Sequence, residues 1–107
     1  MNITGRSVNG ILTITIEGEI DESVSNNARA RLETILEKNI YRCVVFDLSK
    51  VLFMDSTGIG IMLGRYKKLK GQKIPTYILN PSPYAERIFN ATKLFDLMPK
   101  IYDKEIV

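Results

Sequence analysis

The spacing of the apolar residues changes along this chain, from every second position to every third or fourth position and back. In residues 11–17, Leu12, Ile14 and Ile16 alternate with threonines, which is typical of a half-buried β-strand. From about residue 23 to 38, apolar residues recur at three- and four-residue intervals, as in an amphipathic helix. Repeated switching between these two periods predicts an α/β fold.

The other segments continue the pattern. Residues 3–8 form a weak strand, joined to residues 11–17 by the turn signal Asn9-Gly10. The apolar run 43–46, which ends in Asp47, suits a central strand that is buried on both faces. We expect a second helix from residue 57 or 58 to about 70, a strand at 74–79, a third helix that Ser82 caps before Pro83, and a short last strand at 101–102.

This order predicts a mixed β-sheet with an N-terminal β-hairpin, parallel central strands and helices packed mainly on one face. We expect residues 1–107 to form a single domain. Functional loops in such sheets follow the carboxyl ends of strands. Asp21 follows the second strand and residues 47–57 follow the third, so the two loops should meet. Asp21 or Ser23 is also placed to cap the first helix.

The chain has no histidine and a single cysteine, Cys43, which excludes several kinds of chemistry. Histidine-dependent nucleophiles and histidine-ligated metals are ruled out, and one cysteine forms neither an internal disulfide nor a cysteine-rich metal site. Any chemistry must therefore use carboxylates, hydroxyls, lysines or a partner's groups. We predict that the protein is not an enzyme, has no catalytic residue and binds no metal or cofactor of its own.

The charge distribution is uneven although the net charge is only +3. Residues 64–107 carry nine basic and four acidic groups, and the basic groups are densest in residues 65–70. Such a surface suits electrostatic steering of a charged partner, but two ordinary solvated faces explain it as well. Nucleic-acid binding would need a more continuous basic surface. No apolar run reaches the length of a membrane span and no secretory signal is visible, so we expect a cytoplasmic protein without membrane contact.

A polar triplet, Asp55-Ser56-Thr57, leads into Gly58-Ile59-Gly60 and then into helical spacing. The stretch lacks the G-x-S-x-G elbow of a nucleophilic serine. Ser56 interrupts the Asp-Thr-Gly order of aspartic proteases, and the glycines form neither a Walker A motif nor a full dinucleotide fingerprint. A receiver-like phosphoaspartate at Asp47 would need an acidic pair after the first strand, which is missing.

Two interpretations of Ser56 stay open on physical grounds. Four amide donors lie unpaired at a helix start, and any residue of the triplet could cap them, with Thr57 the expected cap. Alternatively, phosphorylation of Ser56 would add about −1.5 to −2 charges beside Asp55, which the helix amides tolerate and a docked partner need not. Glycines at 58, 60 and 64 each cost up to ~1 kcal/mol in a helix, so we expect close packing against the sheet or a partner there.

The stretch 53–60, followed by Leu63-Gly64-Arg65-Tyr66-Lys67, resembles the signature of anti-sigma factor antagonists, the STAS-domain family. It is most similar to the sporulation sigma-F branch. Gly18-Glu19-Ile20-Asp21 is similar to the family's Gly-Glu-Leu-Asp turn, and residues 80–95 are similar to its third-helix region. The resemblance covers residues 8 to 103, approximately.

The resemblance implies a binding module that is also a kinase substrate. Its partner would be a GHKL-type anti-sigma factor, a serine kinase that brings ATP and Mg²⁺, and the unphosphorylated antagonist would bind this kinase and release the sigma factor. Phosphorylation of Ser56 would end the binding, and a PP2C-type phosphatase would restore it. The alternative is a STAS interaction subunit without a switch, in a lipid-transport or stressosome-like assembly. The isolated protein is expected to be monomeric. The expected partner-binding residues are Asp21, Asp55, Ser56, Thr57, Gly58, Ile59 and Gly60.

The chain departs from the family pattern at three places. The sigma-F branch commonly has two histidines after the aspartate of the Gly-Glu-Leu-Asp turn, where this chain has Glu22-Ser23. Lys93 replaces a usual glycine, at a cost of roughly 1–2 kcal/mol if the backbone there is left-handed. Relatives usually continue into a further helix beyond the position of Val107, so we expect part of the sheet to be less covered or to self-associate.

Overall fold

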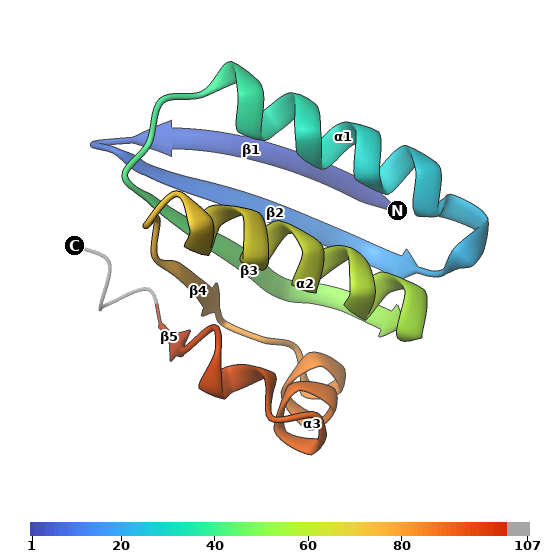
Figure 1. Ribbon diagram of the computed structural model, residues 1–107. Coiled ribbons are helices and arrows are strands. Elements are labelled where there is room, and N and C mark those ends of the chain that lie inside the picture. Colours follow the sequence, from blue (N-terminus) through green and yellow to red (C-terminus); the bar gives the residue numbers. More distant parts are fainter. Residues whose placement is uncertain (103–107) are drawn as a thin grey trace.

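The computed structural model describes residues 1–102 and contains a five-stranded sheet with helices packed on it (Figure 1). The strands follow chain order, with β1 antiparallel to β2 and the other neighbours parallel. This confirms the predicted mixed sheet with an N-terminal hairpin. The elements are β1 (Asn2–Val8), β2 (Ile11–Ile20), the 3-10 turn η1 (Glu22–Val24), α1 (Ser25–Lys38), β3 (Cys43–Met54), α2 (Ser56–Gly71), β4 (Thr76–Leu79), α3 (Pro83–Ala91), the 3-10 turn η2 (Leu94–Asp96) and β5 (Lys100–Ile101).

The hairpin forms because its turn residues accept positive φ angles. Asn9 has φ 53° and Gly10 has φ 81°, the conformation that a two-residue hairpin turn requires. In β2, Leu12, Ile14 and Ile16 are buried on the face that the helices cover. The intervening threonines are half-buried on the other face, as the alternation predicted.

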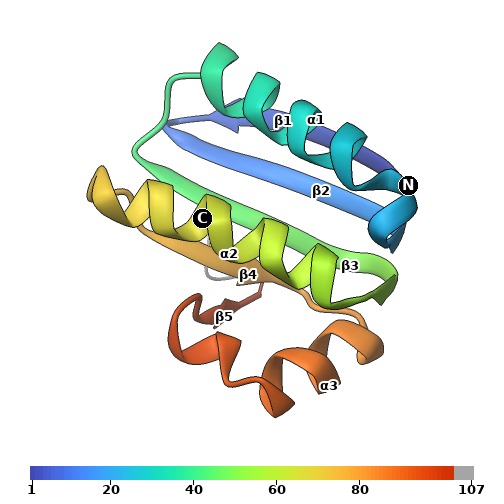
Figure 2. The same ribbon diagram turned by 45° about the vertical axis from the view of Figure 1, so that its right-hand side comes forward.

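The helices α1 and α2 lie side by side on one face of the sheet, as Figures 1 and 2 show from two directions. The buried side chains of α1 are mainly those of the predicted apolar stripe, and Leu32 is 1% exposed. The helix α3 packs against β3 and buries Ala85 and Phe89. None of the helices formed by residues 1–102 combines the length and the apolar character that crossing a membrane demands.

The third strand is much longer than predicted. We expected a strand over residues 43–46 and a loop from Asp47 to Thr57, but β3 extends to Met54 and only Asp55 separates it from α2. Pairing with β2 continues to Ile20↔Met54 across two register shifts, with Gly18 at φ 91° beside the second shift. These irregularities break the period-two pattern, because a bulge changes which residues face the core. The spacing of the apolar residues therefore did not predict the extended part of β3.

The C-terminal third follows the predicted capping pattern. Ser82 accepts a hydrogen bond from the backbone amide of Ala85 at 3.1 Å and also donates to the carbonyl oxygen of Val51 at 2.7 Å. Pro83 occupies the first turn of α3. Lys93 lies beyond α3 with φ 60° and ψ 26°, so the left-handed conformation that the family glycine suggested is present. β4 (Thr76–Leu79) is shorter than the predicted strand at 74–79, because the pairing with β3 begins only at Thr76.

Candidate functional site

The residue that caps α2 is Asp55. Its Oδ1 accepts a hydrogen bond from the backbone amide of Gly58 at 2.9 Å, and the helix begins at Ser56. The expectation that Thr57 is the cap was therefore wrong, because Thr57 lies inside the first turn. A carboxylate is suited to this position, since it accepts from an unpaired amide and complements the positive end of the helix dipole.

The same carboxylate joins two loops. Its Oδ2 accepts a hydrogen bond from the backbone amide of Glu22 at 3.2 Å, and the Asp55 amide donates to the carbonyl oxygen of Ile20, also at 3.2 Å. The turn after β2 and the start of α2 are thus held together at one end of the sheet. This confirms that the two loops meet, as expected. The long loop expected after the third strand is absent, and the extended β3 itself brings Asp55 to the turn after β2.

Asp21 accepts hydrogen bonds from within its own turn. Its Oδ1 accepts from the backbone amide of Ser23 at 3.0 Å and from the Ser23 hydroxyl at 2.5 Å, and the hydroxyl hydrogen bond lowers the pKa of Asp21 below its ordinary value of 3.8. Asp21 therefore caps η1, which precedes α1. The residue at the α1 cap position, Val24, has no side-chain hydrogen bond.

Three of the α2 glycines, Gly58, Gly60 and Gly64, differ in their surroundings. A Cβ on Gly58 would lie 2.7 Å from the Ile20 carbonyl oxygen, so only glycine lets the helix start this close to β2. A Cβ on Gly60 or Gly64 would have no neighbour within 4 Å in the part of the chain that the structure describes. Close packing against the sheet is therefore confirmed for Gly58 and wrong for Gly60 and Gly64, where packing against a partner stays a prediction.

Ser56 is exposed, and its hydroxyl forms no hydrogen bond to any residue between 1 and 102. Neighbouring Thr57 and Ile59 are half-buried, and Gly60 is exposed. The site thus presents a free hydroxyl on the first turn of a helix, where backbone amides tolerate an added anion. Within residues 1–102 no three histidine, cysteine, aspartate or glutamate side chains gather into a metal-binding group.

An apolar patch beside this site was missed in the sequence. Leu52 is 70% exposed and Phe53 41% exposed, at the end of β3 just before Asp55. The Phe53 ring lies 5.7 Å from the Tyr84 ring, and the Tyr84 hydroxyl donates to the Met54 carbonyl oxygen at 2.8 Å. The guanidinium of Arg87 lies over the Tyr84 ring. The sequence did contain a signal for this patch. The consecutive apolar residues at the end of β3 are more than the one buried face of a strand requires.

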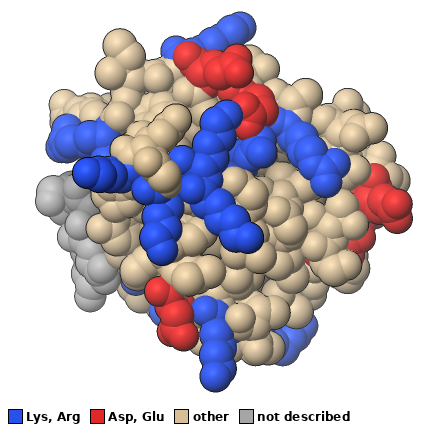
Figure 3. All heavy atoms as spheres, viewed as in Figure 1, with Lys and Arg blue, Asp and Glu red and all other residues tan. Residues whose placement is uncertain are grey.

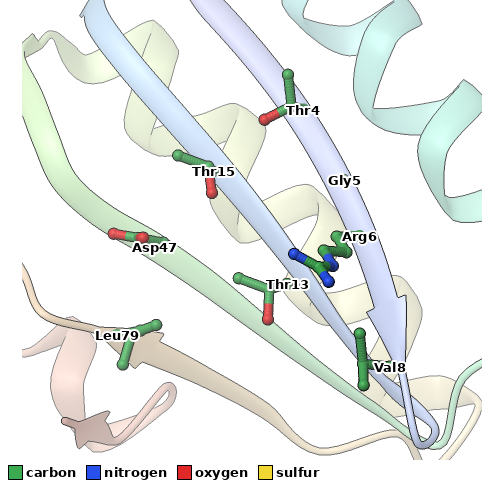
Figure 4. Close-up of a pocket in the computed structure, with 8 residues that line it drawn as sticks. All are labelled: Thr4, Gly5, Arg6, Val8, Thr13, Thr15, Asp47 and Leu79. Atoms are coloured by element: carbon green, nitrogen blue, oxygen red, sulfur yellow. The ribbon is translucent and has the colours of Figure 1, made fainter. Parts of the chain in front are cut away.

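The face of the sheet opposite α1 and α2 carries a polar hollow of about 530 Å³ (Figure 4). Thr13, Thr15 and Asp47 point into it from β2 and β3, and Arg6 lies on its β1 side. The Asp47 carboxylate accepts a hydrogen bond from the backbone amide of Ser49 at 3.0 Å. Asp47 therefore lies on a different surface from Ser56 and takes no part in the Ser56 site.

Comparisons with known proteins agree on the family. The STAS domain model matches residues 2–105. A relative from Paenibacillus polymyxa, named anti-sigma F factor antagonist, is 31% identical over 97 residues, covering 91% of this chain and 82% of the relative. SpoIIAA in its unphosphorylated form superposes with a TM-score of 0.77 at 26% identity, covering 98% of this chain and 92% of that one. The phosphorylated form of the Bacillus cell fate determinant SpoIIAA gives 0.72 at 26% identity, covering 98% and 96%. This chain belongs to the STAS domain family.

Proposed function

We propose that this protein is an anti-sigma factor antagonist. In its unphosphorylated form it binds an anti-sigma factor and thereby releases the sigma factor, and phosphorylation of Ser56 switches the binding off. The observation that carries the proposal is the exposed Ser56 hydroxyl at the start of α2, beside a second loop that Asp55 holds in place. The names of the relatives support it, since they include an anti-sigma F factor antagonist and a SpoIIAA in both phosphorylation states.

The proposed partner surface is built on the partner-binding residues expected from the sequence. Some of these residues position the site, and the others contact the partner. Asp55 and Gly58 position the site, since their contacts are internal. Asp21, Ser56, Thr57, Ile59 and Gly60 are left to contact the partner, together with the apolar pair Leu52 and Phe53. Exposed apolar side chains next to a polar rim are typical of an interface.

Electrostatics supplies the switch. A phosphate on Ser56 brings about −1.5 to −2 charges next to Asp55, Asp21 and Glu22, which are acidic already. The amides of the first helical turn stabilise that charge, so the fold persists. A partner that docks against the unmodified hydroxyl then meets a bulky anion and a strongly negative surface, and its affinity falls.

The partner in this proposal is itself the kinase. An anti-sigma factor of the GHKL type would bring ATP and Mg²⁺, while this chain supplies only the acceptor hydroxyl and the docking surface. A PP2C-type phosphatase with its own metal ions would remove the phosphate. The chain has no histidine to activate Ser56, and both carboxylate oxygens of Asp55 already accept hydrogen bonds from backbone amides, so in this proposal the kinase supplies the base for phosphoryl transfer.

The test uses the purified protein and the GHKL anti-sigma factor kinase encoded in the same genome. With Mg-ATP, intact-mass spectrometry should show addition of one phosphate, and fragmentation should place it on Ser56. Ser56→Ala should accept none and should bind the kinase even with ATP present. Ser49→Ala, which alters an exposed serine outside the proposed partner surface, should still be phosphorylated on Ser56.

Two results would overturn the proposal. One is the absence of phosphate on Ser56 with a kinase that modifies another antagonist. The other is a stable complex with the kinase that Ser56→Asp leaves unchanged, which would favour a STAS interaction subunit without a switch.

A further inference from the structure

The second half of α2 carries a group of basic side chains that the Ser56 site does not use. Lysines and arginines gather over this part of the molecule (Figure 3). Arg65 and Lys68 form ion pairs with Glu33, the latter at 3.0 Å. The remaining lysines are exposed and form no ion pair within residues 1–102. We call Lys67, Lys68, Lys70 and Lys73 the α2 basic end.

A small hollow adjoins the α2 basic end. It measures about 210 Å³ and lies between the C-terminal ends of α1 and α2. Leu36 and Leu69, both buried in the core cluster, contribute apolar surface to it, and Tyr41, Lys68 and Gln72 complete most of its wall. The Tyr41 hydroxyl donates to the Leu36 carbonyl oxygen at 3.1 Å, which holds the ring in place. Since a cavity of about 150 Å³ takes up benzene, one apolar side chain fits here.

We propose that the hollow and the α2 basic end together form a second docking surface, which takes an acidic segment of a protein partner. One aliphatic or aromatic side chain of that segment enters the hollow, and flanking carboxylates pair with Lys67, Lys68 and Lys70. Lys67 and Lys70 lie three residues apart on α2, are exposed and form no ion pair within residues 1–102, so their charges are complementary to acidic groups and steer them. An apolar anchor in a preformed pocket then fixes the position.

A nucleic acid fits this surface less well. Single-stranded nucleic acids need a continuous basic track with aromatic faces for the bases. Here Glu33 lies among the basic side chains and Glu37 lines the hollow, so the track is interrupted. A peptide can place its carboxylates on individual lysines and avoid these two glutamates.

The second surface is separate from the proposed switch. Lys68 lies twelve residues beyond Ser56 on one helix, which is on the order of 18 Å along the axis. That distance exceeds the Debye length of ~8 Å at physiological ionic strength. Phosphorylation of Ser56 therefore leaves this docking surface active, and a partner that has lost the Ser56 site can stay attached through it.

The experiment uses the full chain, labelled with ¹⁵N, and a capped hexapeptide with leucine and phenylalanine between two pairs of acidic residues. Amide shifts should concentrate at Leu36, Tyr41, Leu69 and Gln72. Lys67→Glu combined with Lys70→Glu should weaken binding about tenfold at low salt and reduce its salt dependence. The matched control, Arg6→Glu with Arg29→Glu, changes net charge equally at exposed sites elsewhere and should bind like the parent.

Three results would overturn the proposal: shifts spread over other faces, equal loss in the control variant, or tighter binding of an oligothymidylate than of the peptide at these residues. Ser56→Asp should leave peptide binding unchanged. Because of this, loss of the Ser56 switch and loss of the second docking surface are detected separately.

Discussion

A methyl group on Gly58 would lie 2.7 Å from the carbonyl oxygen of Ile20. That oxygen also accepts the hydrogen bond from the Asp55 amide at 3.2 Å, so it belongs to the contact that joins β2 to α2. A methyl group on Gly60, two positions further on, would meet no atom within 4 Å in residues 1–102. One glycine is required by the fold, and the other is not.

This contrast predicts opposite effects of the same substitution. Gly58→Ala should lower the free energy of unfolding by about 1–3 kcal/mol, because the helix start has to move away from β2. Gly60→Ala should raise it by about 0.5–1 kcal/mol, because alanine is the better helix former and has free space. Urea denaturation of both variants measures this, and a stabilised Gly58→Ala would contradict the packing described for the site.

Asp55 should couple the two loops through its two oxygens. Asp55→Ala removes both acceptors, so amide hydrogen exchange should accelerate at Gly58 and at Glu22, with a stability loss of about 1–2 kcal/mol. Asp55→Asn keeps one acceptor oxygen and gains a donor, so only one of the two amides can stay protected. Exchange measured by NMR distinguishes these patterns. Equal protection in all three proteins would mean that the carboxylate does not join the loops.

The sequence predicted the architecture well because its apolar periods are clean where the elements are regular. The hairpin turn, the core face of β2 and the Ser82–Pro83 start of α3 each depend on local chemistry that a short window contains. The meeting of the Asp21 loop with the Ser56 loop also followed from strand order alone.

What the sequence missed depends on contacts between distant segments. The extension of β3 to Met54 arises from pairing with β2 across two register shifts, which hides the alternation. Three residues in a row could each cap α2, and only the approach of Glu22 favours the two-oxygen side chain of Asp55. The role of each glycine was equally undecidable, because it depends on whether β2 or empty space lies opposite.

The Glu33 pair predicts a pH dependence of stability. The hydrogen bond from Lys68, together with the charges of Lys68 and Arg65, lowers the pKa of Glu33 from its ordinary value of 4.5. A carboxyl group whose pKa is lower in the folded state stabilises the fold above its unfolded pKa, and this stability disappears as the pH falls through the folded pKa. The free energy of unfolding should therefore drop below about pH 4.5, with Glu33 contributing at most about 1 kcal/mol because the pair is partly exposed.

Substitutions on α1 isolate that contribution. Glu33→Gln should lower stability at neutral pH and show a smaller drop on acidification than the parent. Glu37→Gln, also on α1 and without an ion pair within residues 1–102, serves as the control and should follow the parent curve. Thermal unfolding between pH 3 and 7 measures both, and identical acid profiles for parent and Glu33→Gln would show that the pair adds nothing to the pH dependence.

Lys93 should be a site where the chain can be stabilised by one change. Its φ of 60° is left-handed, which costs a residue with a Cβ roughly 1–2 kcal/mol, and its side chain is exposed. Lys93→Gly should therefore raise the free energy of unfolding by about 1 kcal/mol, after the larger entropy of glycine in the unfolded chain is deducted. Lys93→Ala removes the same side chain but keeps the Cβ, so it should give no comparable gain. If both variants were stabilised equally, relief of backbone strain would not be the cause, because the two substitutions share only the loss of the lysine side chain beyond Cβ, with its charge.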